Sequence, residues 1–98
     1  MPYIKPEERN KWEEALNHIA FQIESIKQDH KETQQTQLDG ELNYLITHIL
    51  IMAYSKKYFD CNRAVGMLEC CKQEFYRKFI GPYEDHKAIE NGDVYPKE

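Results

Sequence analysis

The chain has 98 residues and a formal net charge of −4, with 41% hydrophobic and 31% charged residues. This length is enough for one small hydrophobic core, so we expect a single domain over residues 1–98, and the four glycines and four prolines favour helices over a turn-rich β sandwich. The acidic balance argues against a protein that binds the backbone of DNA or RNA.

The first predicted helix runs from residue 6 to about residue 28. Pro6 suits a first helical turn, and the acids Glu7 and Glu8 favour the positive end of the helix dipole. Apolar residues then recur at steps of four and three, at Trp12, Leu16, Ile19, Ile23 and Ile26. Phe21 lies nearly opposite this seam and is a possible oligomer contact. Residues 29–38 are polar and without period, which predicts a solvated loop.

The second predicted helix covers residues 40–56, with Asp39 as its N-cap. One face carries Leu42, Leu45, Ile46, Ile49, Leu50 and Ala53, and another carries Tyr44, His48, Ile51 and Ser55. A helix with two apolar faces is either central in the fold or packed against a partner chain. In a three-helix domain one side touches the other two helices, and the other side needs the C-terminal tail or a second subunit. We expect a homo-oligomer.

The third predicted helix covers residues 61–80, with Asp60 or Asn62 as its cap. Its seam consists of Cys61, Val65, Leu68, Cys71, Phe75 and Phe79. Gly81 is expected to end this helix in a left-handed conformation, and Pro82 to begin a short fourth helix over residues 82–90.

Asn91 and Gly92 form a helix stop, and residues 91–98 an extended tail that Val94 and Tyr95 would anchor. The predicted fold is all-α, a three-helix antiparallel bundle with a short C-terminal helix and this tail.

Nothing in the sequence predicts a secreted or membrane protein. The three cysteines, Cys61, Cys70 and Cys71, form no disulfide framework and are expected as reduced thiols. The longest uncharged apolar run, Leu42 to Tyr54, is too short to span a bilayer. Met1 begins no targeting segment. We therefore expect a cytoplasmic location.

No catalytic, metal or cofactor site is predicted. The histidines, His18, His30, His48 and His86, are scattered and not paired at ligand spacing. A magnesium-dependent nucleotide pyrophosphohydrolase of the all-α type is the weakest alternative, because the acids Glu13–Glu14 and Glu84–Asp85 lack the further carboxylate that such a cluster needs. No serine stands in a nucleophile elbow, and no glycine-rich loop is present to bind phosphate.

The strongest ligand-binding candidates lie on the third helix, in the one locally basic part of the chain. Arg77 could bind a phosphate or carboxylate with its guanidinium fork, and Lys72 adds a point charge. Tyr76, assisted by Tyr44 and Tyr83, could stack on a base. Two alternatives stay open: a solvated face with weak ion pairs, or Arg77 bracing the tail through an acid of the fourth helix.

Four blocks of this chain resemble a family of small uncharacterised proteins from phage, prophage and gut bacterial genomes. The blocks are PYIKPEER (Pro2–Arg9), ELNYLIT (Glu41–Thr47), GMLECCKQEFYRKF (Gly66–Phe79) and PYEDHKAIENGDVYP (Pro82–Pro96). The resemblance covers nearly the whole chain outside the 28–38 loop. It implies a viral or mobile-element origin, and hence a role in the host cytoplasm.

The leading functional hypothesis is a non-enzymatic phage-type binding protein that acts as a homo-oligomer. It would sequester a nucleotide or cyclic oligonucleotide immune signal of the host, as some compact helical anti-defence proteins do. The alternative is a protein that modulates a host or phage enzyme by binding to it, with no small ligand.

Overall fold

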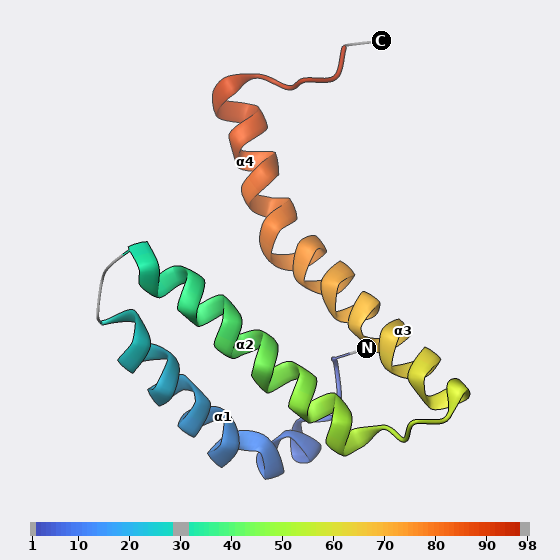
Figure 1. Ribbon diagram of the computed structural model, residues 1–98. Coiled ribbons are helices and arrows are strands. Elements are labelled where there is room, and N and C mark those ends of the chain that lie inside the picture. The colour runs from blue at the N-terminus through green and yellow to red at the C-terminus, as the bar shows by residue number, and fades with distance from the viewer. Residues whose placement is uncertain (1, 29–31, 97–98) are drawn as a thin grey trace. The chain divides into compact units, whose positions relative to one another are not determined.

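The computed structural model describes residues 2–28 and 32–96, and it is helical throughout. The described residues are predominantly helical and contain no strand, which confirms the all-α prediction. The elements are α1 (Pro6–Lys27), α2 (Glu32–Ala53), α3 (Tyr58–Phe75), the π-helix η1 (Tyr76–Ile80) and α4 (Gly81–Asn91) (Figure 1). The last three join into one continuous helix of 34 residues.

The chain divides into two compact units. The first, Tyr3–Cys61, contains α1, α2 and the beginning of α3, and the second starts at Asn62 and contains the rest of the long helix. The predicted bundle requires α3 to pack against α1 and α2, and this arrangement stays a prediction. So does the single domain.

Helix α1 starts where the sequence places its signals. Pro6 occupies the first turn after Lys5, with Glu7 and Glu8 beside it, and the Glu8 N–H donates to the Lys5 carbonyl at 2.8 Å. The acids stabilise the N-terminal end of the helix dipole, and Lys27 lies in the last turn where a cation is favourable.

Helix α2 begins at Glu32, so the solvated loop expected over residues 29–38 is wrong for residues 32–38. Asp39 consequently lies inside the helix and is not its N-cap. The stretch contains glutamine and glutamate, which are good helix formers, so a helix can form there without an apolar period. The helix ends at Ala53, before the expected residue 56.

A short turn connects α2 to α3. The Ser55 hydroxyl donates to Asp60 Oδ2 at 2.5 Å, and the Lys57 N–H donates to the Ser55 hydroxyl oxygen at 3.3 Å. Helix α3 starts at Tyr58, ahead of both expected caps, so Asp60 lies in its first turn. There its carboxylate still interacts favourably with the helix dipole.

The break expected at Gly81 is absent. Gly81 has φ −53° and ψ −52°, which is right-handed helical backbone rather than a left-handed cap. Its N–H donates to the Tyr76 carbonyl, five residues back, which is the hydrogen bond of a π-helix. Pro82 follows in the first turn of α4. Since proline lacks an N–H and its ring collides with the preceding turn of an α-helix, the wider π turn lets the helix continue past it.

The end of α4 matches the predicted stop, but the tail is not anchored as expected. Gly92 has φ +89°, a conformation that favours glycine, and its N–H donates to the Ala88 carbonyl at 2.9 Å. The Tyr95 N–H donates to Asp93 Oδ1 at 3.0 Å and forms a local turn. The side chains proposed as anchors, Val94 and Tyr95, are exposed.

We expect the Pro82→Ala variant to be more stable than the wild type. Alanine restores a backbone donor and removes the ring, and proline costs up to about 3 kcal/mol relative to alanine inside a helix. Each kcal/mol should raise the melting temperature by about 4–8 °C in a chain of this size. Thermal unfolding followed by circular dichroism measures the change. Pro96→Ala, outside the helices, is the control, and a lower melting temperature for Pro82→Ala would contradict this account of the π turn.

Candidate functional site

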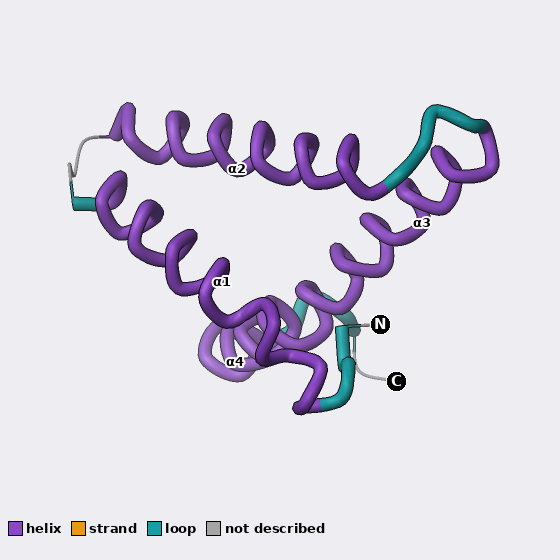
Figure 2. Tube along the Cα trace, turned by 90° about the horizontal axis from the view of Figure 1, so that it is seen from below, coloured by secondary structure: helices purple, strands orange, loops and turns teal. Residues whose placement is uncertain are grey.

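An apolar groove lies between α1 and α2 within the first unit. The two helices are in contact, and the end of α1 lies near the beginning of α2 (Figure 1). From those ends the helices diverge (Figure 2). Each contributes a seam spaced by four and three residues: Trp12, Leu16, Ile19, Ile23 and Ile26 on α1, and Leu38, Leu42, Leu45, Ile49 and Met52 on α2. We call these two seams together the α1–α2 groove.

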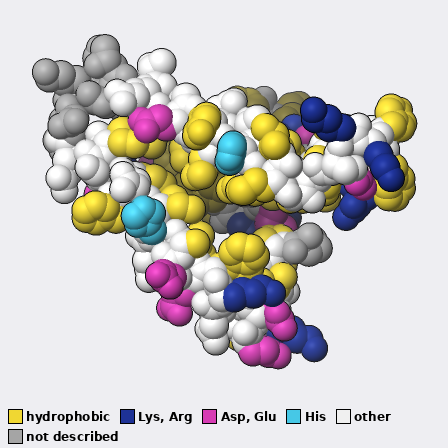
Figure 3. All heavy atoms as spheres, turned by 60° about the horizontal axis from the view of Figure 1, so that its bottom comes forward, with side chains coloured by type: hydrophobic (Ala, Val, Ile, Leu, Met, Phe, Trp, Pro, Cys, Tyr) yellow, Lys and Arg dark blue, Asp and Glu magenta, His cyan; other side chains and the backbone are white. Residues whose placement is uncertain are grey.

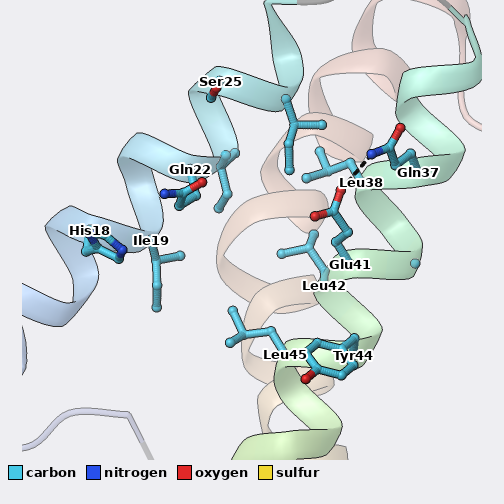
Figure 4. A pocket seen from close by; sticks show the side chains of 13 residues that line it. His18, Ile19, Gln22, Ser25, Gln37, Leu38, Glu41, Leu42, Tyr44 and Leu45 are labelled. Atoms are coloured by element: carbon cyan, nitrogen blue, oxygen red, sulfur yellow. Dashed lines mark hydrogen bonds between the residues drawn. The ribbon is translucent and has the colours of Figure 1, made fainter.

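The closed end of the groove forms a hollow of about 710 Å³. Its apolar walls are the half-buried side chains Ile19, Ile23 and Ile26 from α1 and Leu38, Leu42 and Leu45 from α2. The leucines of α2 point across towards α1 (Figure 4). The volume lies within the range of ordinary ligand and peptide sites.

The open end of the groove leaves large apolar side chains in solvent. Leu16 is 60% exposed and Trp12 54%, while on the facing seam Met52 is 70% exposed. Hydrophobic side chains are accordingly visible at the surface of the face shown in Figure 3. In the described part of the chain Ala64 is the only buried hydrophobic residue. Apolar surface on this scale is typical of a site that another molecule covers.

The rim of the groove is mainly uncharged and polar. Gln22 and Ser25 line it on α1, and on α2 the Gln37 side-chain amide donates to Glu41 Oε2 at 3.1 Å (Figure 4). Beyond the closed end, α2 carries no charged residue from Leu42 to Ala53. The apolar walls can therefore bury apolar groups, and Glu41 is the carboxylate that lines the hollow at its edge.

The two cations predicted to bind a ligand are engaged on their own helix. Lys72 Nζ lies 3.1 Å from Glu69 Oε1, and Arg77 Nη2 lies 2.9 Å from Glu74 Oε1. Arg77 thus pairs with the preceding turn rather than with the acids of α4. The hydrogen bond from Lys72, with a second from Gln73, holds the pKa of Glu69 below its ordinary value.

The three predicted tyrosines lie on different elements. Tyr76 belongs to η1, next to Arg77, and Tyr83 lies on α4 with Lys87 Nζ 5.7 Å from its ring centroid. Tyr44 is in the other unit, where its ring stacks on His48 with centroids 5.7 Å apart. Lys72, Tyr76 and Arg77 are therefore grouped on successive turns of one helix. Their role as a ligand site stays a prediction.

The sequence reasoning missed Leu38 and Met52 as members of the groove. Leu38 fell in the expected loop, and Met52 was assigned to neither face of α2. The steps from Leu38 through Leu42, Leu45 and Ile49 to Met52 are four, three, four and three, the same as in α1. That repeat was the signal that could have identified both residues.

In residues 2–28 and 32–96, no group of three or more His, Cys, Asp or Glu side chains is arranged so that it could hold a metal ion. Cys61, Cys70 and Cys71 are free thiols and exposed. The Cys71 thiol lies 3.5 Å from the Met67 sulfur, a local contact within α3.

We expect Ile23→Ala to weaken the α1–α2 pair while Phe21→Ala does not. Ile23 is half-buried against α2, whereas Phe21 on the same helix is 70% exposed. Removing a fully buried isoleucine costs about 2–5 kcal/mol, so a half-buried one should lower the free energy of unfolding by about 1–2 kcal/mol. Urea denaturation of both variants measures this difference. Equal effects of the two substitutions would contradict the assignment of the seam.

Comparison with known proteins adds the family and leaves the activity open. No curated protein and no solved structure matches the chain. None of the described helices is long and apolar enough to cross a membrane. A family model described as a domain of unknown function matches residues 1–94, in keeping with the resemblance to an uncharacterised family. The chain therefore belongs to the family of the domain of unknown function DUF6899.

Proposed function

We propose that this chain is a non-enzymatic protein-interaction module that binds an amphipathic helix of another protein in the α1–α2 groove. The observation that supports it is the exposure of the two seams. Their side chains are half-buried at the closed end of the groove and exposed at Leu16, Trp12 and Met52. Two helices that bury only part of their matching apolar seams leave room for a third.

The form of the groove favours a helix over a small molecule. The seams extend over several turns beyond the hollow, and a bound helix presents apolar residues at the same steps of three and four. Glu13 and Glu14 lie on α1 near the open end and are exposed, whereas the facing part of α2 is uncharged. The partner helix is therefore apolar on one side and basic along the edge that meets α1.

This proposal corresponds to the protein-modulator hypothesis from the sequence. From the resemblance to phage and prophage proteins we expect such a module to act in a host cytoplasm, where the bound helix would belong to a host or phage enzyme. Occlusion of a helix that the enzyme needs would then change its activity.

A photo-crosslinking residue in place of Leu16 should capture this partner in the cells that produce the protein. Leu16 is at the open end of the groove, so a photoreactive side chain there would touch a bound helix. The same residue in place of Phe21, on another side of α1 and similarly exposed, is the matched control. We expect one discrete adduct from position 16, identified by mass spectrometry, and none from position 21.

A second substitution tests whether the adduct depends on the groove. Leu45→Asp places a charge in the wall of the hollow and should remove the adduct from position 16. An adduct that survives this substitution would count against the groove. An adduct with a second copy of this chain alone would show that the groove has no other protein as its occupant.

Nucleotide sequestration is the second candidate function, and the π-helix favours it. Tyr76 and Arg77 lie in η1, with Lys72 one turn earlier, and π turns within α-helices are frequent at functional sites. An anionic ligand would have to compete with Glu69 and Glu74 for the two cations. The homo-oligomer expected from the sequence would add further residues to such a site.

We expect the pKa of Glu69 to report whether Lys72 binds phosphate groups. Its pKa is lowered mainly by the hydrogen bond from Lys72, so a phosphorylated ligand that captures Lys72 should raise it. Lys72→Met should raise it without any ligand. Carboxyl titration by NMR, with a cyclic dinucleotide as the probe and Arg77→Ala as the variant that prevents binding, measures both effects. An unchanged Glu69 pKa at saturating probe would exclude this site.

A further inference from the structure

The outer side of α2 carries a second seam, almost opposite the one that faces the groove. It consists of Gly40, Tyr44, Thr47 and Ile51, again at steps of four and three, with His48 beside it. Tyr44 is 69% exposed and Ile51 is 67% exposed. Gly40, Tyr44 and Ile51, with Thr47 and His48, line a shallow hollow of about 350 Å³. We call this surface the outer seam of α2.

We infer that the outer seam binds the same seam of a second copy of this chain, with the two α2 helices antiparallel. This inference goes beyond the proposed function, because it concerns the side of α2 that carries Thr47 and Ile51 and not the groove seam, although Gly40 and Tyr44 also line the edge of the hollow. Its occupant is argued from the distribution of charge and from the match of opposing residues.

Charge specifies both the partner and its direction. From Tyr44 to Ile51 the seam lies within a stretch without charged residues, Leu42 to Tyr54, so two copies can meet there without repulsion between like charges. The start of this stretch is flanked by Asp39 and Glu41, and its end is followed by Lys56 and Lys57, all exposed. An antiparallel second copy places the acidic end of each helix at the basic end of the other, whereas a parallel copy places like charges together.

One symmetric register satisfies the whole seam. With the twofold axis midway between Thr47 and His48, Tyr44 lies opposite Ile51 of the second copy, and Asp39 lies towards the turn after Ala53 that carries Lys56. An isologous interface requires this kind of self-complementarity, in which each residue of a pair recurs on the other subunit.

Gly40 supports close approach of the two helices at this surface. A glycine inside a helix costs roughly 1 kcal/mol relative to alanine, and it is usually accepted where another backbone approaches. A Cβ atom at Gly40 would meet nothing within 4 Å in the structure, so packing inside this chain does not require the glycine. Because one helix pair buries less than the roughly 800 Å² per partner of a standard interface, we expect a reversible dimer.

Sedimentation velocity of the full chain over a wide range of concentrations tests this inference. The wild type should shift from monomer to dimer as its concentration rises. Ile51→Lys should remain monomeric at every concentration, because it places a charge opposite Tyr44 of the second copy at both ends of the symmetric contact. Phe21→Lys is the matched control on α1, equally exposed, and it should dimerise like the wild type. Circular dichroism verifies that both variants keep their helix content.

A charge exchange tests the antiparallel direction. Asp39→Lys and Lys56→Asp should each weaken the dimer, and the double variant should restore it. A wild type that is monomeric throughout, or a dimer that Phe21→Lys disrupts as strongly as Ile51→Lys, would overturn the inference. The inference would also be overturned if Leu16→Asp abolished the dimer while Ile51→Lys left it intact, because the second copy would then occupy the groove. If the wild type dimerises as expected but position 16 gives no adduct with another protein, the result would instead count only against the proposed function.

Discussion

The uncharged stretch of α2 from Leu42 to Ala53 is the feature on which the rest of this molecule depends. It is apolar on nearly every side, and a helix of that kind is stable in water only when neighbours cover it. Helix α1 covers one side, and only in part, since Leu42 and Leu45 are half-buried while Met52 is exposed. The groove and the outer seam are therefore two consequences of the same unsatisfied surface.

The sequence allowed the all-helical class, the first helix and the final stop at Gly92 to be predicted, because each rests on strong local signals. The prediction from sequence failed at two places, residues 32–38 and the pair Gly81–Pro82. Residues 32–38 have no apolar period but good helix propensity, so periodicity could not reveal their helix. Gly81 and Pro82 normally end a helix, but the hydrogen bond from the Gly81 N–H to the Tyr76 carbonyl converts the stop into a π turn.

Of the candidate site, only the apolar faces of the helices that form it could be predicted from the sequence. Both faces of α2 were recognised from sequence, as was the need for a partner, but the opening between α1 and α2 depends on how two helices diverge in space (Figure 2). Arg77 and Lys72 were selected for their chemistry, and chemistry alone could not show that Glu74 and Glu69 already hold them. The Lys72–Glu69 pair is exposed and contributes little to stability, so a ligand could replace it without loss of the fold, whereas the Glu74 side chain is only 16% exposed and holds Arg77 more firmly.

The two apolar faces of α2 also govern which substitutions the family can tolerate. In an ordinary surface helix, the solvent side accepts almost any residue, and changes accumulate there. In α2, between Leu42 and Ala53, a charge introduced at a seam position would fall in the groove or on the outer seam, so two sides of this helix are not permissive. Variation is instead expected on the charged side of α1. Under the two proposals, each seam of α2 changes only together with the surface that covers it.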